Sequence, residues 1–126
     1  MNSPLPNPHL LVVEDNPALR QMIREICDFK AIPVFLFEQA EPALEFLDDH
    51  PECRRMLIDL DLPGISGIEF CQRVRPEFPD ATIVAMTGFT SQWDKAACLQ
   101  AGFDQLCQKP LQFDRVFRAL ALPVDE

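Results

Sequence analysis

Glycine is scarce in this sequence, with four residues in 126. The chain has neither a glycine-rich phosphate-binding loop nor the Gly-x-Ser-x-Gly turn that presents a nucleophilic serine. Because both motifs need glycines at fixed spacing, the sequence argues against a stand-alone hydrolase or nucleotide-dependent enzyme.

Basic residues are also few: eleven Lys and Arg stand against twenty Asp and Glu, for a net charge of −9. No basic cluster offsets this balance, which argues against nucleic acid or an anionic membrane as the main partner. The longest apolar stretches have the length of a strand, too short to cross a bilayer. Residues 1–8 are polar and proline-rich and lack the pattern of a signal peptide, so we expect a cytoplasmic protein.

The cysteines are odd in number, and no Cys-x-x-Cys pair occurs among Cys27, Cys53, Cys71, Cys98 and Cys107. An even count or closely spaced pairs would be expected of a disulfide framework or a zinc site. We therefore predict reduced thiols, as is usual in the cytoplasm. Three of them, Cys27, Cys71 and Cys98, fall on helix faces that we expect to be buried.

What the sequence does contain is an alternation of apolar runs and helix-period segments, repeated five times. The runs predict strands at 10–13, 33–37, 56–59 and 82–86 and around 106–107. The first helix should follow Asn16 and bury Leu19, Met22, Ile23, Ile26 and Cys27. Further helices are expected over 40–50, after the capping box of Ser66 and Glu69, from near Ser91 to 101–102, and around Phe113, Val116, Phe117 and Leu120.

Five such units in one chain predict an α/β fold, a doubly wound five-stranded parallel sheet with helices on both faces. Pro33 suggests that the second strand lies at an edge of the sheet. The order 2-1-3-4-5 of a flavodoxin-like three-layer sandwich satisfies both conditions, and its ligand site lies beyond the carboxyl ends of the strands.

Polar side chains stand at those strand ends: Glu14, Asp15, Asp59, Thr87 and Lys109. Clustered carboxylates repel one another unless a cation compensates, and hard oxygen ligands suit Mg²⁺. A carboxylate can also act as a nucleophile and form an acyl phosphate, which a hydroxyl and an ammonium group would stabilise. Each residue alone would be read as a helix cap or a solvated side chain, and only their joint occurrence supports a site.

Neither histidine is placed to be a metal ligand. His9 precedes the first strand and His50 lies in a predicted loop. Neither position joins the strand ends, so we predict that both are surface residues without a functional role.

Four segments occur in a recognisable order: Val13-Glu14-Asp15-Asn16, Leu57-Ile58-Asp59-Leu60-Asp61-Leu62-Pro63-Gly64, Ala85-Met86-Thr87-Gly88 and Gln108-Lys109-Pro110. Together they closely resemble the receiver domain of two-component response regulators, over about residues 9–122. The resemblance implies a CheY-like fold, with residues 1–126 as a single receiver domain. No output domain follows Glu126, so we expect either a single-domain regulator or a piece cut from a larger protein.

The resemblance also implies a role for each site residue. Asp59 would be the phosphoacceptor, and Asp15, Asp59 and the main-chain carbonyl of Asp61 would bind Mg²⁺. Glu14 would orient metal-bound water. Thr87 would supply the switch hydroxyl, and Lys109, through a bond to Pro110 that is usually cis, would pair with the phosphoryl group.

The function implied is Mg²⁺-dependent phosphoryl transfer from the phosphohistidine of a histidine kinase or phosphotransfer protein to Asp59, in two-component signalling or a phosphorelay. This would switch binding of a downstream protein at the face of the fourth helix, fifth strand and fifth helix. The domain would be no enzyme beyond its own phosphorylation and slow dephosphorylation, and a monomer or weak dimer. The alternative is a phosphorylation-independent docking module on the same fold.

Two departures from the family pattern stand out. Leu106 occupies the position that usually holds a switching Tyr or Phe, and it favours the alternative function. Asp61 adds a carboxylate beside the acceptor, and Phe89 could cover the site, so we predict an altered lifetime of the phosphoryl group. Phe89, Trp93, Leu106 and Leu111 are expected near the top of the docking face, with Trp93 partly buried.

Overall fold

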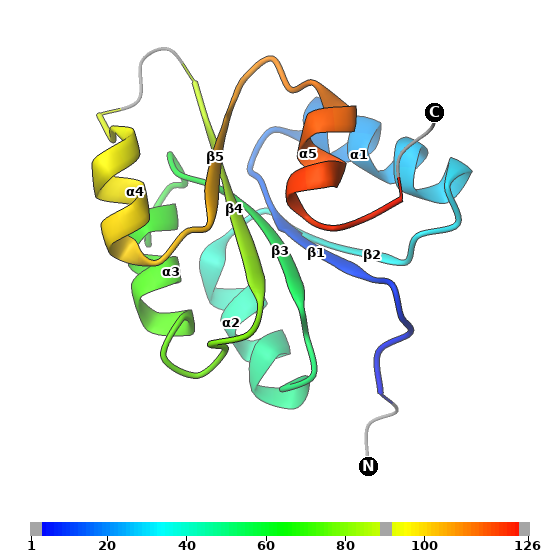
Figure 1. The fold of residues 1–126 in the computed structure, drawn as a ribbon, viewed down its shortest axis with the longest axis horizontal. Coiled ribbons are helices and arrows are strands. Elements are labelled where there is room, and N and C mark those ends of the chain that lie inside the picture. Colours follow the sequence, from blue (N-terminus) through cyan, green and yellow to red (C-terminus); the bar gives the residue numbers. More distant parts are fainter. Residues whose placement is uncertain (1–3, 89–91, 124–126) are drawn as a thin grey trace.

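The computed structural model describes residues 4–88 and 92–123. Over these residues five parallel strands form one sheet in the order β2-β1-β3-β4-β5, and helices connect them (Figure 1). In chain order the elements are β1 (Leu10–Val13), α1 (Pro17–Phe29), β2 (Val34–Phe37), α2 (Ala40–Asp49), β3 (Arg55–Asp59), α3 (Gly67–Val74), β4 (Thr82–Thr87), α4 (Lys95–Ala101), β5 (Gln105–Gln108) and α5 (Phe113–Ala119). The predicted fold, strand order and edge position of the second strand are confirmed.

Helices cover both faces of the sheet, α1 and α5 on one side and α2, α3 and α4 on the other (Figure 1). Strand β1 shows why its residues form a continuous apolar run. Leu10 and Val12 pack into the core beneath α1 and α5, whereas Leu11 and Val13 pack into the core beneath the other helices. Since successive side chains of a strand point to opposite faces, a strand buried on both faces must be apolar throughout.

The strand register brings the carboxyl ends together at one edge. Val13 pairs with Ile58, Asp59 with Met86, and Thr87 with Gln108. Because all strands are parallel, the residues that follow β1, β3, β4 and β5 meet at this edge, as the sequence predicted.

Local capping sets most helix starts. The side chain of Asn16 accepts hydrogen bonds from the Ala18 and Leu19 N–H groups, which caps α1. Ser66 Oγ likewise accepts from the Glu69 N–H at 3.2 Å and caps α3. The Glu69 side chain pairs with Arg73 at 2.6 Å, so the observed cap is the serine half of the expected box.

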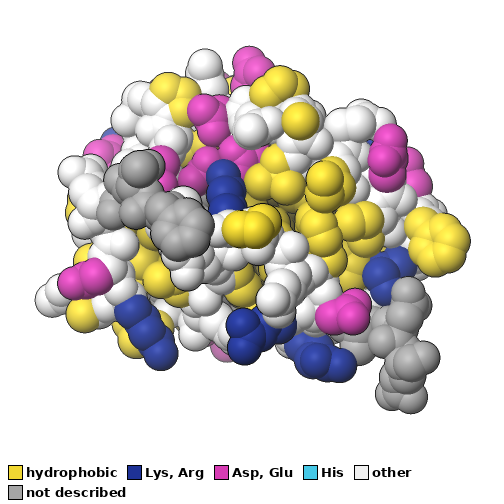
Figure 2. All heavy atoms as spheres, turned by 90° about the horizontal axis from the view of Figure 1, so that it is seen from above, with side chains coloured by type: hydrophobic (Ala, Val, Ile, Leu, Met, Phe, Trp, Pro, Cys, Tyr) yellow, Lys and Arg dark blue, Asp and Glu magenta, His cyan; other side chains and the backbone are white. Residues whose placement is uncertain are grey.

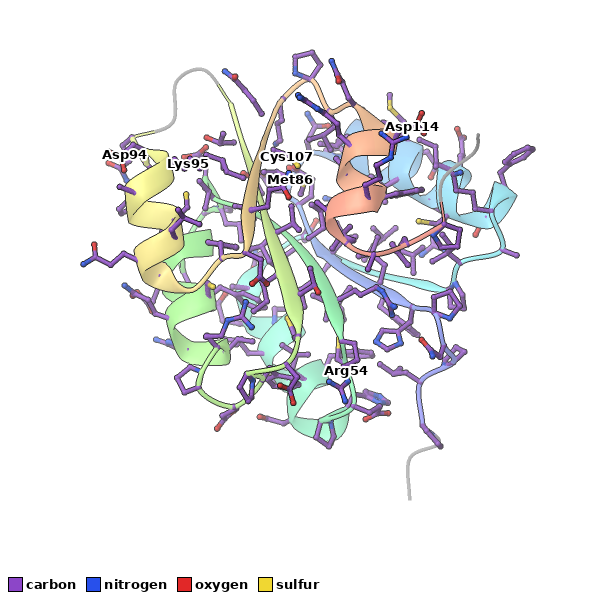
Figure 3. All side chains as sticks on the ribbon, in the orientation of Figure 1. Arg54, Met86, Asp94, Lys95, Cys107 and Asp114 are labelled. Atoms are coloured by element: carbon purple, nitrogen blue, oxygen red, sulfur yellow. The ribbon has the colours of Figure 1, made fainter. Side chains whose placement is uncertain are left out.

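Helix α4 begins later than predicted. Its first residue is Lys95, and the Asp94 carboxylate caps it by accepting from the Ala97 N–H at 2.8 Å (Figure 3). The predicted start near Ser91 lies outside the described residues. The helix as described begins at Lys95, because Asp94 supplies the cap. The helix ends at Gly102, whose φ of 117° is left-handed, as predicted from the favoured glycine stop.

Two predictions of burial were wrong. Met22 is 49% exposed, because only the stripe through Ile23 and Cys27 of α1 faces the sheet. His9 is 3% exposed rather than a surface residue. Its Nδ1 lies 2.8 Å from the Pro6 carbonyl oxygen, and its Nε2 accepts from the Arg54 N–H at 3.0 Å. His50 is half-buried, with its ring centroid 4.3 Å from that of Phe46.

All five cysteines are free, and four of them are buried. Burial raises the pKa of the thiols of Cys27 and Cys53 to about 11 and that of Cys71 to about 12. These thiols stay protonated near neutral pH, which agrees with their predicted role as packing groups. Among the described residues, no helix has the length and apolar character needed to cross a bilayer.

Candidate functional site

Three carboxylates converge beyond the ends of two neighbouring strands. Glu14 and Asp15 follow β1, Asp59 ends β3, and one oxygen of each lies within 4.8 Å of the others. Glu14 and Asp59 are buried, whereas Asp15 is exposed. Because β1 and β3 are paired, the sheet itself holds the acids together despite their repulsion. Such a set of hard oxygen ligands fits Mg²⁺.

Lys109 reaches into this acidic group from the end of β5. Its Nζ lies 2.6 Å from Glu14 Oε1 and 3.2 Å from Asp59 Oδ2. Burial by itself lowers the pKa of Lys109, but the neighbouring Glu14 and Asp59 carboxylates outweigh it and raise the pKa above its usual value. The ammonium group therefore stays charged and offsets part of the carboxylate repulsion.

The Glu14 side chain is fully buried beside these charges. Burial raises the pKa of its carboxyl to about 7, and the Lys109 ammonium only partly opposes this effect. Its Oε2 accepts from the Asn16 N–H at 3.0 Å. Its Oε1 is paired with the Lys109 ammonium and has no other partner among the described residues. An oxygen in this state has capacity for metal-bound water, and the residues present fit a Mg²⁺ site.

The Asp59 carboxylate is held by both of its oxygens. Asp59 Oδ1 accepts from the Asp61 N–H at 2.9 Å, and Oδ2 accepts from Lys109. The chain then turns away from the sheet, where the Leu60 N–H donates to Met86 O and the Gly67 N–H donates to Leu60 O. These contacts fix the direction in which Asp59 points.

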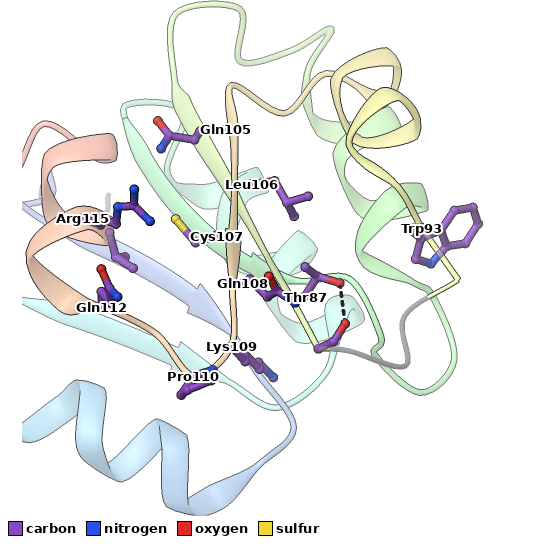
Figure 4. Close-up of a pocket in the computed structure, with 12 residues that line it drawn as sticks. Thr87, Trp93, Gln105, Leu106, Cys107, Gln108, Lys109, Pro110, Gln112 and Arg115 are labelled. Atoms are coloured by element: carbon purple, nitrogen blue, oxygen red, sulfur yellow. Dashed lines mark hydrogen bonds between the residues drawn. The ribbon is translucent and has the colours of Figure 1, made fainter.

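Thr87 lies at the same edge but is not hydrogen-bonded to Asp59 in this structure. It is 7% exposed, and its Oγ1 donates to the Gly88 carbonyl at 3.3 Å (Figure 4). The Lys109 N–H donates to Thr87 O at 2.7 Å, so the hydroxyl and the lysine are joined through the backbone. The bond between Lys109 and Pro110 is cis, as the family resemblance implied. Phe89 lies outside the described residues.

Two supporting residues were missed in the sequence. Arg20 on α1 donates from Nη1 to the Glu14 carbonyl oxygen at 2.9 Å and lies 3.7 Å from Glu38. Gly67 lies so close to the backbone of Asp59 that a Cβ atom there would collide with the Asp59 carbonyl oxygen. The glycine directly after the Ser66 cap was the available signal for Gly67, whereas nothing local marks Arg20.

These features define a parallel α/β domain with a cluster of three carboxylates and a lysine at its strand ends. The model of the response regulator receiver domain matches residues 10–121. The chain therefore belongs to the receiver-domain family of two-component response regulators. Such domains are not enzymes apart from the chemistry of their own phosphorylation.

Among curated proteins, the chain is 30% identical over 108 residues to the response regulator MprA of Mycobacterium ulcerans and 29% identical to that of Mycolicibacterium vanbaalenii. Each alignment covers 85% of this chain but 46% of the relative. The chain thus spans about half the length of these relatives.

Solved structures show the same fold. A response regulator receiver protein from Pseudomonas putida has a TM-score of 0.81 and 21% identity, covering 93% of this chain and 98% of that one. The receiver domain of Ssk1 from Saccharomyces cerevisiae, solved with the histidine phosphotransfer protein Ypd1, matches with a TM-score of 0.79 and 23% identity. That match covers 90% of this chain and 86% of the other.

Proposed function

We propose that this domain accepts a phosphoryl group on Asp59 from a phosphohistidine donor in a Mg²⁺-dependent reaction. The observation that carries the proposal is the buried Asp59 carboxylate, held by Lys109 and lying among oxygens of Glu14 and Asp15. Membership of the receiver family supports the same chemistry. Asp15, Asp59 and the main-chain carbonyl of Asp61 would bind the ion, and Glu14 would orient its water.

In the proposed step, a carboxylate oxygen of Asp59 attacks phosphorus. The P–O bond forms as the P–N bond to the donor imidazole breaks, and the imidazole keeps the electron pair. Bound Mg²⁺ would supply neutralisation of phosphoryl charge. Lys109 then pairs with a phosphoryl oxygen in place of the Asp59 oxygen that it now contacts. The Thr87 hydroxyl, which needs to leave only the Gly88 carbonyl, would donate to another.

The phosphoryl donor would dock beside the Asp59 site, along α1. Met22, Ile26 and Phe29 recur at helical spacing, and Met22 and Phe29 are 49% and 84% exposed. Seen from above the strand ends, acidic side chains gather around a basic one, and a hydrophobic surface lies beside them (Figure 2). An apolar helix stripe next to the acceptor suits a helical donor. The complex of the Ssk1 receiver with a phosphotransfer protein supports a donor of that kind.

Phosphorylation would act on the face formed by α4, β5 and α5, where a downstream protein would bind. The added group carries about −1.5 to −2 charges, which would draw Thr87 and Lys109 toward Asp59. Trp93, Leu106 and Leu111 are all partly buried on this side of the molecule. Trp93 has the partial burial that the sequence predicted.

The alternative function, phosphorylation-independent docking, has one observation in its favour. Leu106 packs partly buried against the core beneath α4, and it has no hydroxyl or aromatic ring to move when Thr87 moves. The altered phosphoryl lifetime stays a prediction, to be checked by comparing the decay of parent and Asp61→Asn. A single domain over residues 1–126, a cytoplasmic location and a monomer or weak dimer also stay predictions.

The proposal is tested by intact mass after incubation with Mg²⁺ and a small phosphodonor, with Asp59→Asn alongside. We expect the parent to gain one phosphoryl group and the variant none, and a chelator to abolish the gain. A phosphorylated histidine protein serves as a second donor. If neither donor modifies the parent, the phosphoryl switch is wrong and the docking module replaces it.

A further inference from the structure

The outer edge of β5 has a groove that the proposed phosphoryl chemistry does not use. Strand β5 pairs with β4 and ends the sheet. An open groove of about 800 Å³ runs along it, between α5 and the segment that leads into α4. In the close-up, β5 passes down the middle of the groove with Leu106 on one flank and Cys107 on the other (Figure 4).

The backbone of β5 is suited to receive another strand. Just beyond the strand, the Lys109 N–H donates to Thr87 O of β4 at 2.7 Å. Peptide groups of a strand alternate in direction, so those of Gln105 and Cys107 also face β4. The N–H and C=O groups of Leu106 and Gln108 therefore point outward along the groove, as on other edge strands. Added strands bind such edges through main-chain hydrogen bonds.

The charge of the groove differs from that of the rest of the molecule. None of its twelve described lining residues is acidic, and two of them, Lys109 and Arg115, are basic. Residues 92–123 carry four basic and three acidic side chains, in a chain whose net charge is −9. Gln105, Gln108 and Gln112 add amide donors and acceptors along the walls. Lys109 is already paired with Glu14 and Asp59, so Arg115 and the absence of acidic side chains from the described lining are what favour an acidic segment. Arg115 also disfavours a second copy of the chain, which would set one Arg115 against another.

We propose that the partner binds this groove as an acidic, extended segment that adds a sixth strand to the outer edge of β5. This proposal rests on the proposed function and adds to it the chemistry of the downstream partner. Thr87 and Lys109 line the groove, and Lys109 also pairs with Asp59. Movement of these two residues toward a phosphoryl group would therefore change the groove wall directly.

The probe is a library of nine-residue random peptides selected on the full chain. We expect the selected peptides to carry Asp or Glu at alternate positions. Arg115→Glu should weaken the dissociation constant of a selected peptide at least tenfold, whereas Arg24→Glu, an exposed arginine of α1 away from the groove, should leave it unchanged. Selection of basic or purely apolar peptides, or of none, would overturn the proposal.

Strand addition is tested with two versions of the same peptide, each methylated on alternate backbone nitrogens. The two versions differ in register, so that the nitrogens methylated in one are free in the other. One register should lose at least tenfold in affinity and the other should bind like the parent peptide. Saturating the chain with the selected peptide should slow hydrogen exchange of the Leu106 and Gln108 amides at least tenfold. Equal binding by both methylated peptides, or a concentration-dependent dimer of the chain that the peptide displaces, contradicts the proposal.

Phosphorylation of Asp59 is measured by mass in the same samples. If the chain is phosphorylated but binds no acidic peptide, only the strand-addition proposal fails. If acidic peptides bind but no donor modifies Asp59, the proposed function fails instead.

Discussion

At the scale of single residues, the placement of Asp59 depends on a glycine, which has no side chain of its own. Gly67 begins α3 directly against the backbone that follows Asp59, and a Cβ there would collide with main-chain atoms of Asp59 and Leu60. Backbone atoms at a strand end cannot move without displacing the Asp59 side chain. Gly88, next to Thr87, is the opposite case, since a Cβ there would meet no atom within 4 Å.

Replacing Gly67 by Ala should therefore destabilise the fold by about 1–3 kcal/mol, as overpacking does in well-packed interiors. Urea unfolding of the two variants provides the measurement. Gly88→Ala is the matched control and should stay within about 0.5 kcal/mol of the parent. Equal stability of both variants would contradict the close packing described for Gly67.

His9 is a second residue whose surroundings decide its behaviour. Its two ring nitrogens bond Pro6 O and the Arg54 N–H, which requires a neutral ring with the proton on Nδ1. Burial, its largest influence, lowers the pKa of His9 below 6.5, and the charges of Arg55 and His50 act in the same direction. The Pro6 carbonyl and the Glu52 carboxylate partly oppose this shift.

The lowered pKa of His9 predicts a pH-dependent stability. Below pH 6.5 His9 becomes protonated in the unfolded chain while it stays neutral in the folded one. The free energy of unfolding should therefore fall as the pH drops from 6.5 to the lowered pKa of the folded state. Above 6.5 this residue should contribute no slope. Thermal unfolding of the parent and of His9→Gln measures the difference. The difference should change over that window and stay constant above pH 6.5, and a difference that is the same at every pH would contradict the lowered pKa of His9.

At the scale of the elements, caps and one long side chain hold the α4–β5 region in place. Arg75 follows α3, and its guanidinium donates to Gly102 O at 2.8 Å and Ala81 O at 2.7 Å. It also pairs with Asp104 at 2.8 Å, and Asp104 accepts from the Ile83 N–H. One side chain thereby joins the end of α4 to the starts of β4 and β5. The other end of α4 depends on the Asp94 cap.

Asp94→Ala should lower the free energy of unfolding by about 1 kcal/mol, because the Ala97 N–H loses its hydrogen-bond acceptor. Asp94→Asn keeps an acceptor oxygen and should stay close to the parent. Amide hydrogen exchange locates the effect, with faster exchange in α4 than in α3. A loss spread evenly over the sheet would show that the cap is not a local determinant of α4.

At the scale of the whole molecule, folding concentrates like charges. The sheet gathers Glu14, Asp15 and Asp59 at one edge of a chain with net charge −9. Lys109 offsets only part of this concentration. A divalent cation that binds only the folded form should therefore stabilise it by mass action.

Mg²⁺ at about a hundred times its dissociation constant should stabilise the fold by about 2.7 kcal/mol, and should raise Tm by several degrees. Calorimetry with and without Mg²⁺ at equal ionic strength is the measurement. Asp15→Asn should lose most of the shift, whereas Asp28→Asn, exposed near the end of α1, should keep it. An equal shift in both variants would place the ion elsewhere.

Local patterns were enough to predict much of this protein. Five apolar runs between helix-period segments implied the parallel sheet, and the polar residues after each run implied its site, because parallel strands bring their carboxyl ends to one edge. Hydrophobic periodicity reports which face of an element is buried. It does not report how wide that face is, and for this reason Met22 was wrongly predicted to be buried.

Contacts between distant segments were decided by the tertiary structure alone. His9 is buried because the peptide of Arg54, 45 residues away in sequence, supplies its second partner. Arg75 reaches Gly102 and Asp104 only because α3 and α4 lie side by side. The groove along β5 likewise exists because the sheet ends there. Each feature depends on register and packing angle, which no local run of residues encodes.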